Sequence, residues 1–239
     1  MAIHVTVWNE RKQDRTQENV LKIYPEGISR AIADFLEQDD GIVARTAALS
    51  DPECGLTEDV LAHTDVLIWW AHVAHDEVPD EIARRVQEAV LKGMGLIVLH
   101  SGHLCKPLRF LLGTSCTLKW RDGDRERLWT VNPTHPIAAG LPEHFELPVE
   151  EMYGEPFDIP EPDETVFLGW FSGGEVFRSG VTYRRGYGKI FYFQPGHESN
   201  PTYHDPNIQR VLRNAVKWAA PTIHREKIDC PNPKPLEKE

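Results

Sequence analysis

The sequence contains few cysteines and lacks any long apolar run. Its four cysteines, Cys54, Cys105, Cys116 and Cys230, are widely spaced and form no CxxC pair. This argues against a zinc site held mainly by thiolates and favours a reduced, cytoplasmic protein. No apolar stretch approaches membrane-spanning length, and the amino terminus lacks a basic segment followed by an apolar signal core. We therefore expect neither membrane insertion nor secretion.

Basic residues are also fewer than acidic ones. The 239 residues include 26 Lys and Arg against 37 Asp and Glu, a formal net charge of −11. The basic residues form no stripe with interleaved aromatics, so a nucleic-acid partner is not expected. The expected partner is a small molecule. A homo-oligomer could form through an exposed sheet edge or the carboxyl-terminal arm.

The pattern of apolar residues predicts one α/β domain over residues 1–220, followed by an extended arm rich in Pro, Lys and Glu over residues 221–239. Strands are expected at residues 3–8, 42–47, 66–70 and 96–99, with an amphipathic helix from Pro79 to Gly93. This βαβ rhythm is typical of a parallel sheet. Shorter strands at 116–120, 126–131, 165–170, 175–183 and 189–193 indicate antiparallel additions, and a last helix follows Pro206.

Three of the apolar runs end in histidine. They cover residues 66–72, 95–100 and 189–197, and deliver His72, His100 and His197. In an open parallel sheet, ligands bind outside the carboxyl ends of the strands. Imidazoles gathered at that rim would be metal ligands or general acid–base groups. The pattern therefore predicts an active site there, provided that the three strands lie side by side.

The segment Leu99-His100-Ser101-Gly102-His103 is the sharpest motif, and two interpretations of it remain open. Ser101 stands roughly where a nucleophile elbow would place its nucleophile, although its neighbours do not match G-x-S-x-G. Alternatively, His100 and His103 are metal ligands or acid–base groups. The structural alternative is a capping serine beside two hydrogen-bonded histidines.

Other candidates surround these motifs. His75 and Asp76 follow His72, and a carboxylate there could orient an imidazole. His197 precedes Glu198 in a Pro-Gly turn, and His204 either closes over the site or is a surface residue.

Three further residues are expected near a substrate. Glu151 and Tyr153 lie in an acidic segment, expected to be a loop that could reach a polar substrate. Trp70, beside His72, could form a flat wall for a sugar ring.

Five segments carry a family resemblance: residues 66–72, 95–103, 135–142, 151–154 and 186–197. With them the chain resembles the ThuA-like (trehalose utilisation) family, whose fold is similar to class I glutamine amidotransferases. The resemblance implies a flavodoxin-like three-layer α/β sandwich and a role in metabolising trehalose or related disaccharides, oxidised ones included. The chain departs from the amidotransferase pattern, because Ser101 or His100 replaces the nucleophilic cysteine. Glutamine hydrolysis is therefore not expected, although His197 and Glu198 are similar to the catalytic His and Glu of that superfamily.

Three functions follow from these observations. The leading hypothesis is a carbohydrate enzyme with a divalent metal, zinc in first place, held by ligands drawn from His72, His100, His103 and His197. Glu151 or Glu198 would tune these ligands or abstract protons. The second is a metal-free hydrolase using Ser101, His197 and Glu198. The third is a non-catalytic sugar-binding or regulatory protein.

Overall fold

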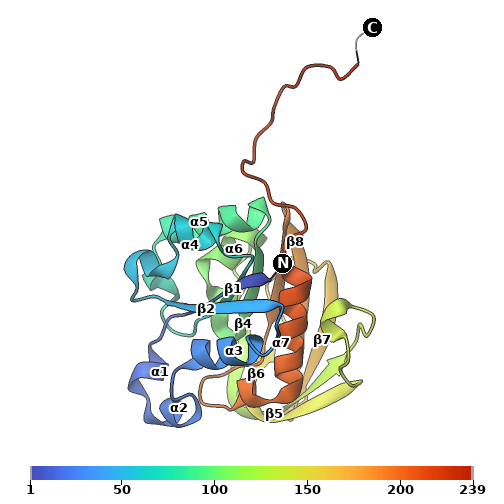
Figure 1. The fold of residues 1–239 in the computed structure, drawn as a ribbon. Coiled ribbons are helices and arrows are strands. Elements are labelled where there is room, and N and C mark those ends of the chain that lie inside the picture. The colour runs from blue at the N-terminus through green and yellow to red at the C-terminus, as the bar shows by residue number, and fades with distance from the viewer. Residues whose placement is uncertain (1, 238–239) are drawn as a thin grey trace.

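The computed structural model describes residues 2–237, and its centre is one mixed nine-stranded sheet (Figure 1). The strand order is β2-β1-β3-β4-β9-β8-β7-β5-β6. The first five strands in that order are parallel to one another, and the remaining four pair in antiparallel fashion. The strands are β1 (Ile3–Asn9), β2 (Ile42–Ala48), β3 (Val66–Trp70), β4 (Gly95–Leu99), β5 (Lys119–Thr130), β6 (His144–Gly154), β7 (Glu164–Phe171), β8 (Val176–Arg185) and β9 (Gly188–Phe193).

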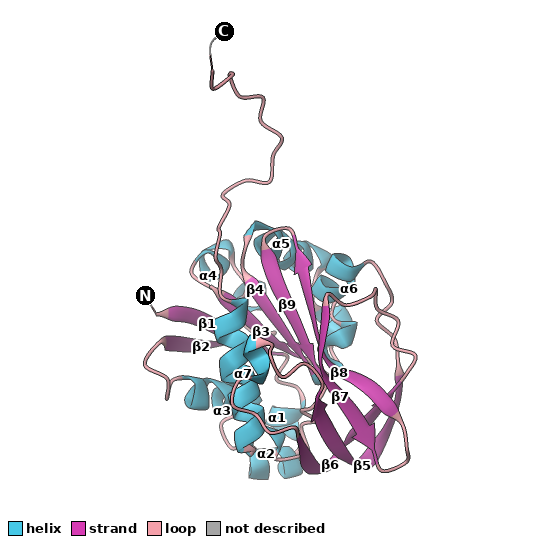
Figure 2. Ribbon diagram, turned by 90° about the vertical axis from the view of Figure 1, so that its right-hand side faces the viewer, coloured by secondary structure: helices cyan, strands magenta, loops and turns pink. Residues whose placement is uncertain are grey.

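Helices cover both faces of the parallel half of the sheet, as Figures 1 and 2 show. Alternate residues of each strand point to opposite faces, so Ile68 joins the core under α3 and α7, whereas Leu67 joins the core under α5 and α6. The predicted three-layer α/β sandwich is confirmed. The α-helices are α1 (Gln13–Thr16), α2 (Glu18–Ile23), α3 (Ile28–Leu36), α4 (Glu58–Ala62), α5 (Asp80–Lys92), α6 (Lys106–Leu112) and α7 (Pro206–Ala219).

The strands β3 and β4 are buried along their whole length, as expected for strands inside a parallel sheet. Short 3₁₀ segments begin at or near the carboxyl ends of the parallel strands. The one after β4, η3 (His100–Leu104), starts at its first residue past the strand. Because the chain turns directly after these strands, the polar residues of the turns, such as His100, lie just beyond the edge of the sheet.

The antiparallel half differs from prediction in two places. The strand expected at 116–120 begins only at Lys119, and the acidic segment around Glu151 is not a loop but the second half of β6. β6 lies at the far edge of the sheet order. Its carboxyl-terminal half nevertheless reaches the residue that follows β9, because Gln194 Nε2 donates to the Glu151 carbonyl at 2.9 Å. The curled sheet thus brings β6 over the rim of the parallel strands.

The segment after α7 contains no helix or strand as far as residue 237, and Figure 1 shows it leaving the body of the molecule. Its start is anchored, because Arg225 N donates to the Lys92 carbonyl at 2.8 Å. Within residues 2–237, none of the helices is both long and apolar enough to cross a membrane.

Candidate active site at the carboxyl ends of the parallel strands

Three histidines and one glutamate meet at the rim of the sheet. We call His72, His100, Glu151 and His197 the His-Glu cluster; one potential ligand atom from each lies within 4.8 Å of those of the others. His72, His100 and His197 follow β3, β4 and β9, which are consecutive neighbours in the sheet. Glu151 comes from β6. Strand adjacency therefore brings together imidazoles that are far apart in the sequence.

His100 occupies a strained turn directly after β4. Its φ is +51°, a left-handed conformation that costs a non-glycine residue roughly 1–2 kcal/mol. Its Nδ1 donates to the Gln194 carbonyl at 3.0 Å, so Nε2 faces the cluster, 3.0 Å from Glu151 Oε2. A nucleophile elbow presents its reactive side chain from such a strand-to-helix turn. Here the side chain presented is an imidazole.

Cys105, the cysteine nearest to His100 in the sequence, cannot serve as the nucleophile in its place. Cys105 is fully buried at the start of α6, and burial raises the pKa of its thiol. A thiol held neutral away from the pocket is not a nucleophile. The geometry is therefore unlike a cysteine-dependent amidotransferase site.

His72 is oriented by a carboxylate. Its Nδ1 donates to Glu198 Oε2 at 2.7 Å, which leaves Nε2 free. The backbone that carries His72 is fixed by the buried Glu10, whose two carboxylate oxygens accept from Val73 N and Ala74 N at 2.9 and 2.8 Å. The predicted acidic partner of His72 is thus Glu198 rather than Asp76.

His197 is carried by a loop tied to Glu150. The Glu150 carboxylate, fully buried, accepts from Gly196 N at 3.0 Å, His197 N at 3.1 Å and Thr202 Oγ1 at 2.8 Å. The Ser199 hydroxyl lies 2.8 Å from His197 Nδ1. Ser199 N also donates to this nitrogen at 3.2 Å, so Nδ1 of the neutral His197 ring is an acceptor and its proton is on Nε2.

Tyr153 and Ser101 form a hydroxyl pair beside His100. The two oxygens are 2.6 Å apart, and the Tyr153 ring stacks on the His100 imidazole with centroids 5.2 Å apart. Burial raises the pKa of Tyr153 well above its usual value, so its hydroxyl stays protonated. Within residues 2–237, Ser101 bonds to Tyr153 and forms no hydrogen bond with His197 or Glu198, the partners that the hydrolase hypothesis gives it.

Burial and mutual attraction set the charges of the cluster. Burial favours the protonated form of Glu151, but the neighbouring His100, His197 and His72 outweigh it and lower its pKa to about 2. Burial likewise opposes the charged form of His100, yet Glu151 and Glu150 raise the pKa of that imidazole. Burial and the charge of His100 lower the pKa of His197. Glu151 is therefore ionised, and its charge favours the protonated form of His100.

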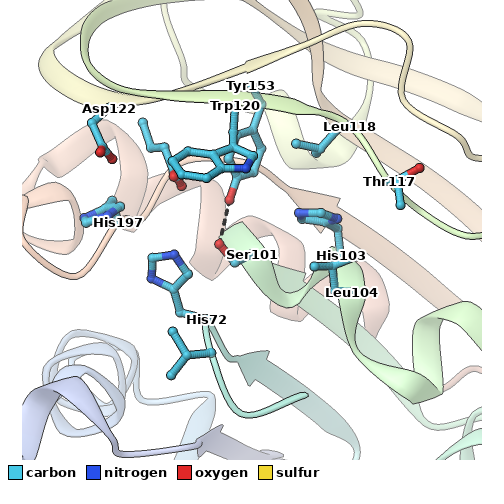
Figure 3. Close-up of a pocket in the computed structure, with 12 residues that line it drawn as sticks. His72, Ser101, His103, Leu104, Thr117, Leu118, Trp120, Asp122, Tyr153 and His197 are labelled. Atoms are coloured by element: carbon cyan, nitrogen blue, oxygen red, sulfur yellow. Dashed lines mark hydrogen bonds between the residues drawn. The ribbon is translucent and has the colours of Figure 1, made fainter. Parts of the chain in front are cut away.

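The cluster opens into a pocket of about 480 Å³, within the size range of small-molecule sites (Figure 3). Glu151, Tyr153 and Ser101 line it close to the histidines. The remaining lining residues are His72, Val73, His103, Leu104, Thr117, Leu118, Trp120, Asp122 and His197.

Three predicted site residues lie outside the His-Glu cluster. His103 lines the pocket but is outside the His-Glu cluster, and its Nδ1 donates to the Cys116 carbonyl at 2.6 Å. Trp70 is buried and donates through Nε1 to the Gly196 carbonyl, so it forms no wall for a sugar. His204 does not line the pocket but stacks on Tyr24, as the surface interpretation predicted.

Sequence reasoning missed Trp120, Asp122 and Glu150. Trp120 and Asp122 lie at the start of β5. They reach the pocket because β5 pairs with β6, which places Trp120 opposite Tyr153. No local sequence pattern predicts this strand pairing. Glu150 directly precedes Glu151. In a strand, two successive side chains point to opposite faces, so a predicted strand would have indicated that only one of the two faces the site.

Solved structures with the same fold include a ThuA-like protein from Parabacteroides merdae, with a TM-score of 0.70 at 15% identity, covering 95% of this chain and 93% of that chain. A cytoplasmic protein from Salmonella typhimurium matches with a TM-score of 0.61 at 14% identity, covering 91% and 99%. A glutamine amidotransferase from Thermotoga maritima matches with a TM-score of 0.56 at 11% identity, covering 92% and 98%. A search of the curated proteins finds no match.

The family comparison covers nearly all of the folded body. The model of the ThuA family, described as trehalose utilisation, matches residues 4–219, from β1 to the last residue of α7. The matched range contains every residue of the His-Glu cluster. The chain belongs to the ThuA family.

Proposed function

We propose that this protein is a metal-dependent enzyme of carbohydrate metabolism that acts on trehalose or a related disaccharide, including oxidised forms. The observation that carries the proposal is the convergence of His72, His100, Glu151 and His197, with potential ligand atoms within 4.8 Å of one another. The family description supports the substrate class. A cytoplasmic location, as named for the Salmonella relative, is part of the proposal.

The donor set fits a divalent transition ion, zinc in first place. Imidazole nitrogens with a carboxylate oxygen are ligands that zinc accepts in catalytic sites. Glu151 Oε2 is buried and, within residues 2–237, has no partner in hydrogen-bond geometry, although His100 Nε2 is 3.0 Å away. A buried carboxylate oxygen without a hydrogen bond is costly unless something else contacts it. A bound ion would give this oxygen a second contact beside His100 Nε2.

The groups that hydrogen-bond to the outer nitrogens of His100 and His72 also fit a metal site. The Gln194 carbonyl accepts from His100 Nδ1 and Glu198 accepts from His72 Nδ1, so each imidazole presents Nε2 to the centre. Outer partners of this kind fix ring orientation and ligand basicity at metal sites.

A divalent ion held there would polarise a carbonyl or hydroxyl oxygen of the sugar. The protein itself contributes the other chemistry. The Tyr153–Ser101 pair can donate a hydrogen bond to a substrate oxygen from inside the pocket, since Tyr153 stays protonated. Two carboxylates, Glu151 and Asp122, line the pocket, and Glu151 is the one beside the imidazoles that can accept a proton.

Elemental analysis and calorimetric zinc titration test the proposal. We expect about one ion per chain in the wild type, with binding weakened at least tenfold in His72→Ala and His197→Ala, since each removes one donor. His63→Ala, which removes an exposed imidazole on the surface, is the matched control.

Turnover of trehalose and of a keto derivative of it, with and without chelator, completes the test. Loss of turnover with chelator and its return with zinc support the enzyme. Sugar binding without turnover would instead favour the regulatory alternative, and a metal-free protein with chelator-insensitive turnover would refute the metal site.

A further inference from the structure

The outer wall of the pocket carries an exposed indole. Trp120 is 64% exposed, although it belongs to a strand, and it lines the same pocket as the His-Glu cluster. It pairs directly across β5 and β6 with Tyr153, so the two side chains share one face of that ladder. Figure 3 shows the indole on the Tyr153 side of the pocket, across from His72.

The pocket also lacks lysine and arginine side chains in its lining. Among the residues that line it, all within the described part of the chain, none is Lys or Arg, whereas Asp122 and Glu151 are acidic. Glu198 lies behind His72 and adds a third carboxylate. Even with a divalent ion bound, these three carboxylates leave the site without net positive charge. A phosphate group has no cationic side chain to pair with here.

An aromatic plane and an acidic acceptor suit an uncharged ring. The C–H face of a pyranose is apolar and packs against an aromatic face, while its hydroxyl groups donate to carboxylates. Leu104 and Leu118 add apolar side chains to the same lining. Asp122 lies near it as the exposed acceptor.

We propose that the pocket selects unphosphorylated, uncharged sugars, with one ring stacked on Trp120 and its hydroxyl groups donating to Asp122. This deepens the function proposed above and rests on it for the sugar as substrate class. It assigns Trp120 as the residue that holds the ring and sets specificity, and places the other end of the sugar at the His-Glu cluster.

Calorimetry or saturation-transfer NMR with trehalose and trehalose 6-phosphate tests the inference on the full-length protein incubated with zinc. We expect trehalose to bind and the 6-phosphate to bind at least about tenfold more weakly. Trp120→Ala should weaken trehalose binding by about 10- to 50-fold, since the burial of one ring face is lost. Trp120→Phe, which keeps an aromatic plane, should lose less, and Asp122→Asn should weaken binding by a few-fold.

Trp129→Ala is the matched control, because Trp129 lies on the same strand, is partly exposed and does not line the pocket. Its affinity for trehalose should equal that of the wild type. Equal or tighter binding of the 6-phosphate, unchanged affinity in Trp120→Ala, or no binding of trehalose would each overturn the inference. Zinc content is measured on the same samples. Binding that depends on Trp120 in a protein unable to take up zinc refutes only the metal site; zinc uptake with binding independent of Trp120 refutes only the present inference.

Discussion

At the scale of single residues, two carboxylates that contact histidines of the cluster have different tasks. Glu198 accepts from His72 Nδ1 at 2.7 Å and so fixes one imidazole from behind. Glu151 faces the centre of the His-Glu cluster and the pocket. Substitution of Glu151 and of Glu198 should therefore affect zinc binding differently. Glu198 is a positioning residue, because it acts through His72.

Glu198→Gln tests that assignment. The amide keeps the size of the side chain but replaces a carboxylate acceptor with a weaker one, so zinc affinity should fall about 10- to 100-fold. Competition with a chromophoric chelator measures the change. Glu18→Gln, on the exposed face of α2, is the control and should leave zinc affinity unaltered. A Glu198→Gln protein with wild-type zinc affinity would show that Glu198 has no part in orienting a ligand.

His103 gives a prediction about stability and pH. Burial lowers the pKa of this imidazole to about 3, from an ordinary value of 6.5. Between these values the unfolded chain binds a proton that the native state does not, so the free energy of unfolding falls as the pH drops through that window. The loss from this group should reach about 3 kcal/mol by pH 4.

The measurement is urea unfolding at several pH values between 7 and 4 for the wild type and His103→Asn. The asparagine amide can still donate to the Cys116 carbonyl but does not titrate. We expect a shallower decline of unfolding free energy in the variant. Parallel curves would mean that His103 is not held neutral in the native state.

At the scale of elements, the loop from Gln194 to His204 depends on β6. Glu150 accepts from the backbone at Gly196 and His197 and from the side chain of Thr202, so a carboxylate on one strand holds the turn after another. The loop contains both His197 and Glu198. Its conformation is thus set by a residue far away in the sequence.

Glu150→Gln should loosen this loop. An amide nitrogen placed among these donors leaves at least one buried donor without an acceptor, which costs about 2–4 kcal/mol of unfolding free energy. Zinc affinity should fall together with stability, because His197 loses its fixed position. Chemical denaturation and zinc titration of the same variant measure both quantities. Lowered stability with unchanged zinc affinity would place His197 outside the metal site.

The sequence failed to predict β6 for a physical reason. Pro148 stands in the middle of this strand, and a proline and paired glutamates indicate a loop. The strand tolerates them because it is the outermost in the sheet order, where one side needs no backbone donor. The burial of Glu150 and Glu151 depends on the curl of the sheet, which no local pattern encodes.

At the scale of the whole molecule, the parallel sheet was largely predictable. Continuous apolar runs gave β3 and β4, and the helix between them made their adjacency a natural consequence of βαβ geometry. The pairing of β4 with β9 was not predictable, since about ninety residues separate them. That pairing is what brings His197 to His100.

The central claim is that the carboxyl edge of this sheet holds a metal ion, and an anomalous-scattering map measures it most directly. Crystals grown from zinc-loaded protein would be recorded on both sides of the zinc absorption edge. The account predicts one strong difference peak per chain within coordination distance of His72, His100, Glu151 and His197, at about 2.0–2.2 Å from their donor atoms. A well-ordered cluster with no peak among these four side chains would contradict it.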